Sequence, residues 1–257
     1  MPDSLVLSAG TLYAFLLVLA RVAGALVFVP LPGIKSTPEP ARAALAVGFT
    51  MALFGRWPAV SPSVVTPGML LAWVAAEATL GVAIGVALAI VIEAFALGAQ
   101  ILGLQAGYAY ASTIDPNTDA DSGVLLVFAQ LVAGMLFFSL GLDREVLRLF
   151  AQSLAAVPSG AYVLNGSSAS AMIRLGSYLF SVGARLALPV IALLVMVDVA
   201  LALIGRLNSQ LQLLSVAFPA KMLTAVLMLS WVAALFPRIM VELSSHAWSV
   251  ARQMTGK

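Results

Sequence analysis

Residues 68–104 read GMLLAWVAAEATLGVAIGVALAIVIEAFALGAQILGL, and Glu77 and Glu93 are the only charged side chains among these 37 residues. A bilayer core requires about 20 consecutive apolar residues in a helix. At about 1.5 Å per residue, a helix over this stretch would be about 55 Å long, which is more than one straight crossing needs. The stretch therefore predicts a membrane helix that tilts, breaks or extends beyond the hydrocarbon.

Five further apolar segments flank this one, at residues 5–34, 43–55, 124–142, 172–205 and 211–237. The segment 172–205 is also overlong, and residues 143–158 between two segments have an amphipathic pattern typical of a membrane interface. Only residues 206–210 separate the last two segments, so we predict that they form an antiparallel helical hairpin. The expected fold is an all-α integral membrane protein, with about six apolar helical segments in a single membrane domain over residues 1–257.

The composition agrees with this fold and excludes several functions. Hydrophobic residues make up 62% of the chain and charged residues 9%, whereas a soluble domain has about a quarter charged residues. The net charge is only +2 and no basic cluster is present, which argues against binding to nucleic acid. The chain has no cysteine and one histidine, so thiol chemistry and a His/Cys metal site are excluded. We therefore expect no enzymatic activity, no cofactor and no metal.

Six charged side chains lie in the interior of the apolar segments, away from their ends: Arg21, Glu77, Glu93, Arg185, Asp198 and Lys221. Charges at membrane depth are costly without a partner, so each is a candidate functional residue. Glu77 and Glu93 would lie about 160° apart around one helix and cannot form a carboxylate pair. We favour ion pairs between helices and between subunits. The alternative is a proton or substrate path in a secondary transporter of a small solute.

Small residues four positions apart occur at Gly81 and Gly85 and again at Gly103 and Gly107. This spacing lets membrane helices approach closely, although it is common in a composition rich in glycine and alanine. Together with the charges and the overlong segments, it indicates a subunit that packs among others.

Residues 103–123 are predicted to form a loop between two apolar segments. The loop contains glycines, tyrosines and a turn-forming Asp-Pro, and its candidate gate residues are Gly103, Gln105, Gly107, Tyr108, Tyr110, Asp115 and Pro116. An irregular loop at membrane depth is tolerated only where protein or a water-filled cavity surrounds it. The loop is therefore a candidate gate, and an ordinary extramembrane loop is the alternative.

Three stretches together resemble the FliR/SctT family of type III secretion export-gate membrane proteins. They are residues 21–42, with Pro30-Leu-Pro32; residues 103–116, with Gly103-Leu-Gln-Ala-Gly107 and Asp115-Pro116; and residues 203–221, with Gly205-Arg-Leu-Asn208 and Phe218-Pro-Ala-Lys221. The second stretch is similar to the flagellar branch. Ser209 and Ala217 depart from the family pattern, which has proline and glycine at these positions.

The resemblance implies a non-enzymatic subunit of the flagellar type III protein export gate, in the bacterial inner membrane and within the flagellar basal body. It implies a pore shared with FliP-like and FliQ-like subunits, a neighbouring FlhB-like subunit, and unfolded flagellar proteins as the exported substrates. Residues 1–170 resemble a FliP-like part with a plug loop at 103–123, and residues 171–257 resemble a FliQ-like hairpin and tail. The six intramembrane charges would then pair between subunits.

The orientation in the membrane receives two different predictions. With six spans, the side that holds both termini carries more Lys and Arg, which places the termini in the cytoplasm by the positive-inside rule. The resemblance instead places the hairpin loop, with Arg206, Asn208 and Gln210, on the cytoplasmic side. We follow the resemblance, because segments inside such a complex need not span lipid independently.

Overall fold

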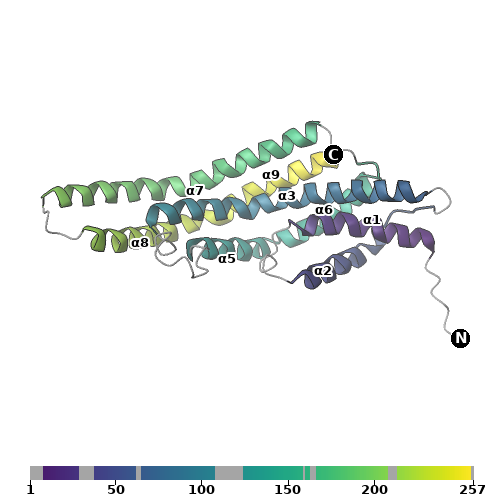
Figure 1. Cartoon of the computed structure of the whole chain (residues 1–257), viewed down its shortest axis with the longest axis horizontal. Helices are drawn as coiled ribbons and strands as arrows, with labels where there is room; N and C mark the ends of the chain where they lie inside the picture. Colours follow the sequence, from purple (N-terminus) through teal and green to yellow (C-terminus); the bar gives the residue numbers. More distant parts are fainter. Residues whose placement is uncertain are drawn as a thin grey trace. The chain divides into compact units, whose positions relative to one another are not determined.

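The computed structural model describes residues 8–28, 38–61, 65–107, 124–158, 160–162, 166–207 and 213–255. Within these ranges every regular element is a helix, and no strand is formed. Long helices account for most of this part of the chain (Figure 1). The predicted all-α membrane fold is confirmed.

Each of the two overlong segments forms one uninterrupted helix. Helix α3 covers Pro67–Ala106 with 40 residues, and α7 covers Gly166–Leu207 with 42 residues. Each is therefore about 60 Å long, twice the bilayer core thickness of about 30 Å. Pro189 lies inside α7 and has no N–H to donate to the carbonyl of Arg185.

Four other apolar segments form helices whose ends differ from the prediction, namely α1 (Ala9–Leu26), α2 (Glu39–Ala52), α5 (Val124–Ser139) and α8 (Leu213–Val232). Helix α2 begins before the expected residue 43 because Pro40 is tolerated in the first turn. A short 3-10 turn, η1 (Phe54–Arg56), follows it.

Helix α5 ends earlier than expected, because the chain turns sharply at a glycine. Gly141 has φ of 69°, in the left-handed region that favours glycine. The amphipathic helix α6 (Leu142–Ala156) begins directly after it. The predicted apolar segment 124–142 and the predicted amphipathic segment 143–158 are thus both helical.

The C-terminal region differs from the expected tail. A 3-10 turn, η3 (Ala233–Leu235), leads into helix α9 (Phe236–Met254). Helix α9 is amphipathic, and its buried side carries Met240, Leu243, Ala247 and Ala251. These positions recur at helical spacing, and the sequence prediction, which gave only a tail after residue 237, did not include this helix.

Among the described residues, fewer helices are long enough to cross a membrane than there are predicted apolar segments. By length and composition, α1, α3, α7 and the stretch Ala217–Met254 qualify, and the bent pair of α5 and α6 adds a fifth candidate. Helix α2 has only 14 residues, which is too short for a span.

The chain forms two compact units. Unit 1 comprises residues 1–90, 141–175 and 244–257, and unit 2 comprises residues 91–140 and 176–243. Helices α3, α7 and α9 contribute to both. The division into FliP-like residues 1–170 and FliQ-like residues 171–257 rests on resemblance to other subunits and remains a prediction.

The core of unit 2 is apolar, and α3 and α7 approach closely in it. Gly98 and Gly183 face each other from α3 and α7, and a Cβ at Gly98 would lie 3.3 Å from the carbonyl oxygen of Gly183. The rings of Phe95 and Phe236 pack edge to face, with centroids 5.4 Å apart. A small apolar pocket beside them is also lined by Leu102.

Candidate functional site

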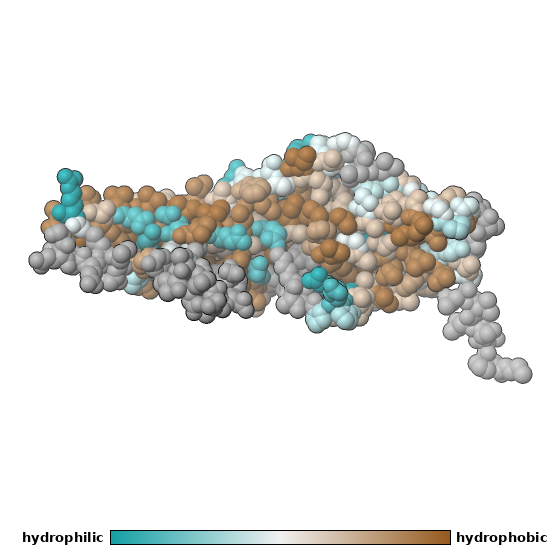
Figure 2. All heavy atoms as spheres, viewed as in Figure 1, coloured by the Kyte–Doolittle hydropathy of each residue, from teal (hydrophilic) through white to brown (hydrophobic). Residues whose placement is uncertain are grey.

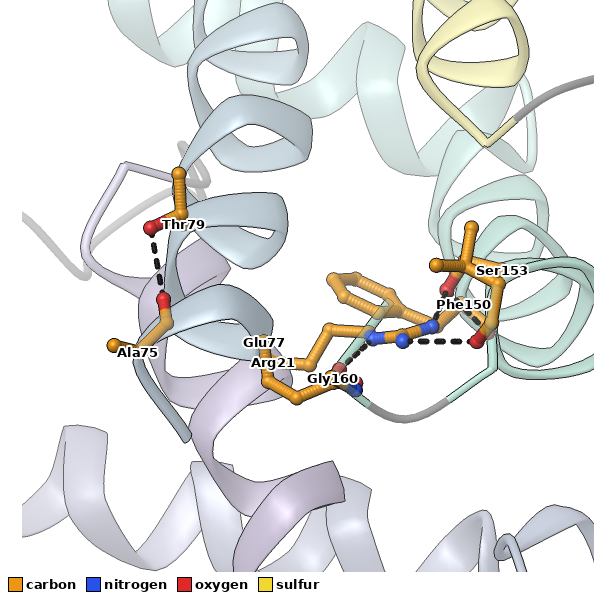
Figure 3. A network of polar contacts seen from close by, with 8 residues as sticks. Arg21, Ala75, Glu77, Thr79, Phe150, Ser153 and Gly160 are labelled. Atoms are coloured by element: carbon orange, nitrogen blue, oxygen red, sulfur yellow. Dashed lines mark hydrogen bonds and ion pairs between the residues drawn. The ribbon is translucent and has the colours of Figure 1, made fainter. Parts of the chain in front are cut away.

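A buried polar cluster in unit 1 connects α1, α3 and α6 (Figure 3). Arg21 on α1 and Glu77 on α3 form an ion pair, and each side chain is only 1% exposed. The guanidinium Nε donates to Glu77 Oε2 at 2.5 Å, and Nη1 donates to Ser153 Oγ at 3.2 Å. Nη2 donates to the carbonyl oxygen of Val157 at 3.3 Å. Three different acceptors therefore satisfy the buried cation.

The second oxygen of the Glu77 carboxylate binds the connection that follows α6. Oε1 accepts a hydrogen bond from the backbone N–H of Gly160 at 3.1 Å. Gly160 has φ of 75°, and a Cβ at this position would overlap the indole ring of Trp73. Only glycine fits at this position. Through its two carboxylate oxygens, Glu77 therefore holds both Arg21 and the backbone of this connection against α3.

Small residues bring α1 and α3 close enough to bury this pair. A Cβ at Gly81 would overlap the carbonyl oxygen of Arg21, and a Cβ at Gly85 would overlap that of Ala25. On the facing helix, a Cβ at Gly24 would lie 2.6 Å from the carbonyl oxygen of Ala78. We call Gly24, Gly81 and Gly85 the glycine seam. The predicted close approach at Gly81 and Gly85 agrees with this packing.

A second ion pair lies in unit 2 and is more open. Lys221 Nζ on α8 donates to Asp198 Oδ2 on α7 at 3.0 Å, and Gln105 Nε2 on α3 donates to the same oxygen at 3.4 Å. The side chain of Asp198 is 41% exposed and that of Lys221 is 17% exposed. The pair holds α7 and α8 side by side, as expected for the predicted hairpin.

Both ion pairs form within the chain, although we expected partners on other subunits. Arg21, Glu77, Asp198 and Lys221 each have a counter-charge on another helix of the same chain. These contacts join helices of one chain, and pairing between subunits stays a prediction. Of the two remaining predicted charges, Glu93 is half-buried on α3 and Arg185 is exposed on α7.

The described part of the predicted gate loop is its first turn. Gly103 and Gln105 belong to the last turn of α3, and Gly107 ends the helix with φ of 85°. A Cβ at Gly107 would lie 3.0 Å from the ring of Phe218 on α8, so the end of α3 packs closely against the hairpin. Tyr108, Tyr110, Asp115 and Pro116 lie outside the described residues.

Of the three predicted hairpin-loop residues, the structure describes Arg206, which is exposed at the end of α7. Asn208 and Gln210 lie outside the described ranges. Within those ranges, no group of three or more His, Asp or Glu side chains is arranged to hold a metal ion.

Three residues that make polar contacts in the structure were not identified as candidate site residues from the sequence. Ser153 continues the apolar stripe of α6 as a lone hydroxyl, and that position could have indicated a buried polar contact. Gly160 carried no signal beyond its occurrence in a loop. Tyr178 on α7 donates to Glu242 on α9 at 2.8 Å. The amphipathic pattern of α9 could have indicated that this segment is a helix that packs against another one.

Large apolar faces remain uncovered on the chain, and hydrophobic residues dominate the visible surface (Figure 2). Only 17% of the most apolar stretch of α7 is buried, and 22% of that of Ala217–Met254. Exposed apolar residues of α7 extend from Ile173 to Leu207. Soluble monomers rarely expose patches of this size, so these faces require lipid or another protein.

Comparison with known proteins identifies relatives over nearly the whole chain. A model of the family "Bacterial export proteins, family 1" matches residues 12–247. The flagellar biosynthetic protein FliR of Escherichia coli K12 is 30% identical over 222 residues, which cover 86% of this chain and 83% of the relative. The proteins of the same name from Caulobacter vibrioides and Bacillus subtilis are each 27% identical, over 85% and 84% of this chain and 87% and 84% of their own lengths.

Proposed function

This chain belongs to the family of bacterial export proteins, family 1, and from that membership we propose that it forms part of the pore of the flagellar protein export gate. As a member of this family it is a membrane component of the flagellar export apparatus. In our proposal it is placed in the bacterial inner membrane, within the basal body. It acts by enclosing a path for unfolded flagellar proteins, and it catalyses no reaction.

The observation that carries the proposal is the uncovered apolar surface of α7. The exposed residues Ile173 and Leu207 are 34 positions apart, which corresponds to about 51 Å along a helix. A bilayer core of about 30 Å cannot cover that length at the usual tilt of a membrane helix. Protein must cover the remainder, which supports a subunit of a larger assembly.

The proposed partners are FliP-like and FliQ-like subunits that share the pore with this chain, and a FlhB-like subunit near the loop that follows Arg206. In this arrangement residues 1–170 take a FliP-like place and residues 171–257 a FliQ-like place, with the loop after Arg206 on the cytoplasmic side. The substrates are unfolded export proteins, and the pore needs no cofactor.

We further propose that residues 103–123 form the plug of the closed pore. Its first turn is anchored, because Gln105 contacts Asp198 and Gly107 packs against Phe218. An anchored stem would keep the rest of the segment close to one place in the lumen. The tyrosines and the Asp-Pro turn of this segment would then fill the path.

A secondary transporter is the alternative function, with Glu77, Glu93 or Asp198 as coupling carboxylates. Two of these carboxylates are engaged with cations of the same chain, an arrangement typical of structural pairs. We therefore favour the export gate.

Purification in mild detergent followed by mass measurement distinguishes the two functions. We expect a large hetero-complex that contains FliP-like and FliQ-like chains. A monomer or a small homo-oligomer would contradict the export gate and favour the transporter.

Shortening the proposed plug tests its role. We expect that replacing residues 108–120 with a short Gly/Ser bridge leaves the complex assembled, because the anchoring contacts of Gln105 and Gly107 remain. Membranes that carry this complex should become permeable to ions and small solutes. If the complex assembles and the membrane stays as tight as with the wild type, residues 103–123 are not the principal seal.

A further inference from the structure

The antiparallel register of unit 2 is set by two polar contacts. Asp198 on α7 contacts Lys221 on α8, and Tyr178 on α7 contacts Glu242 on α9. Going back 20 residues along α7 corresponds to going forward 21 residues along α8 and α9. The register is therefore constant over this length, and it places Arg238 level with about residue 182 of α7, one helical turn from Arg185.

Two exposed arginines on α7 are separated by the thickness of a bilayer core. Arg185 and Arg206 are both exposed and lie 21 residues apart, which is about 31 Å along a helix. The hydrocarbon core of a bilayer is about 30 Å thick. Asp198 is the only charged residue between them on α7, and it is paired with Lys221.

The surface between the two arginines has the properties of a lipid-facing slab. The exposed side chains of α7 in this interval are apolar except for Asp198, which is 41% exposed and paired with Lys221, and Met196, near the middle, is 66% exposed. On α8 the hydroxyl groups of Thr224 and Ser230 donate to carbonyls of their own helix. Because these hydroxyl groups are already hydrogen-bonded, they need no water and can face lipid.

One end of the slab carries the residue types found at a membrane interface. Trp231 is 74% exposed and lies, in the same register, level with about residue 188. Tryptophan and arginine are both typical of the headgroup level. Pro189 leaves the carbonyl of Arg185 without its helical donor, and water at the headgroup level can supply that bond.

From this arrangement we infer that Arg185 and Arg238 form a binding surface for the phosphate groups of anionic phospholipids, at one boundary of a hydrocarbon slab that ends at Arg206. The guanidinium group matches a phosphate in charge and geometry. A partner subunit would impose no particular distance on Arg185 and Arg206, whereas a bilayer imposes the observed one. Arg185 is therefore a boundary residue and lies outside the hydrocarbon.

Depth measurements on the assembled complex in lipid nanodiscs test the slab. The chain has no cysteine, so Arg185→Cys, Met196→Cys and Arg206→Cys each introduce one site for a spin label in this chain. We expect the label at 196 to have the highest accessibility to oxygen and the lowest to a water-soluble nickel chelate, and labels at 185 and 206 to show the reverse. Equal depths, or protection of all three labels from both reagents by a partner subunit, would overturn the inference.

Lipid binding tests the two arginines directly. In nanodiscs that contain phosphatidylglycerol and phosphatidylcholine, we expect Arg185→Gln and Arg238→Gln each to lower the preference for phosphatidylglycerol about fivefold, and the Lys variants to retain it. Arg174→Gln, eleven residues before Arg185 on α7, is the matched control and should change nothing. An unchanged lipid preference in the double Gln variant would overturn the inference.

Discussion

Helices α3 and α7 have nearly the same length and are similarly apolar, yet the rest of the chain covers them very differently. In the most apolar stretch of each helix, 67% of α3 is buried and 17% of α7. The buried helix carries Gly81 and Gly85 of the glycine seam, and Glu77 of an ion pair with both side chains 1% exposed. The open helix carries Asp198, which is 41% exposed. Coverage by the same chain therefore depends on small residues and on fully satisfied charges, and apolar character alone does not determine it.

The largest difference is expected when the acidic partner of each ion pair is removed. Glu77→Ala leaves Arg21 buried without its counter-charge and also removes the acceptor of Gly160, so we expect a loss of about 3–5 kcal/mol in folding stability. The complex recovered in mild detergent should fall accordingly, and any complex that does assemble should still export. Normal assembly with abolished export would instead indicate a proton path through Glu77.

A smaller difference is expected for leucine truncations on the two helices. Leu88 on α3 is fully buried, whereas Leu203 on α7 is mostly exposed. We expect Leu88→Ala to cost about 2–5 kcal/mol, through lost burial and the cavity left behind. Leu203→Ala should change the stability of the chain by no more than about 0.5 kcal/mol. Thermal melting of the detergent-purified protein measures both, and equal effects would remove the distinction between the two helices.

A glycine on each helix gives a comparison of intermediate size. A Cβ at Gly81 of α3 would overlap the backbone of α1, whereas nothing lies within 4 Å of a Cβ at Gly176 of α7. Gly81→Ala should therefore cost about 1–3 kcal/mol. Gly176→Ala should be neutral or stabilise the helix by up to about 1 kcal/mol. Thermal melting of the two variants checks this, since the midpoint temperature should fall for Gly81→Ala and stay unchanged or rise for Gly176→Ala. An unchanged midpoint temperature for Gly81→Ala would argue against the close packing of α1 and α3.

The smallest effect is expected at the open ion pair. Asp198→Asn removes the counter-charge of Lys221 but keeps a side-chain oxygen that can accept from Gln105 and Lys221. Because Asp198 is partly exposed, we expect a loss below about 1 kcal/mol. Matched melting curves for Asp198→Asn and Glu77→Gln provide the check. A larger loss at Asp198 than at Glu77 would reverse the comparison.

Much of the fold could be predicted from local patterns in the sequence. The overlong apolar runs became α3 and α7, and the short connection after Arg206 separates two helices held side by side by Asp198 and Lys221. The break at Gly141 and the helix α9 were missed, because one depends on a single backbone conformation and the other on an amphipathic pattern in a segment with several polar residues.

The charged residues themselves were recognisable in the sequence, but their partners were not. Arg21 contacts residues 56 and 132 positions further along the chain, and no local spacing encodes contacts of that separation. The role of Gly160 depends on its packing against Trp73 and Glu77, which lie one turn apart on α3. Such a position becomes recognisable only when the connection after α6 is already packed against α3.

The long sequence separation within the Arg21 cluster has a consequence for the synthesis of the protein. At about 5–20 residues added per second, Glu77 leaves the ribosome about 3–11 s after Arg21, and Ser153 about 7–26 s after it. During that interval α1 carries a cation with none of its final partners, and a lone arginine at membrane depth is costly. Helix α1 is therefore expected to wait at the insertion machinery and to enter the bilayer together with α3.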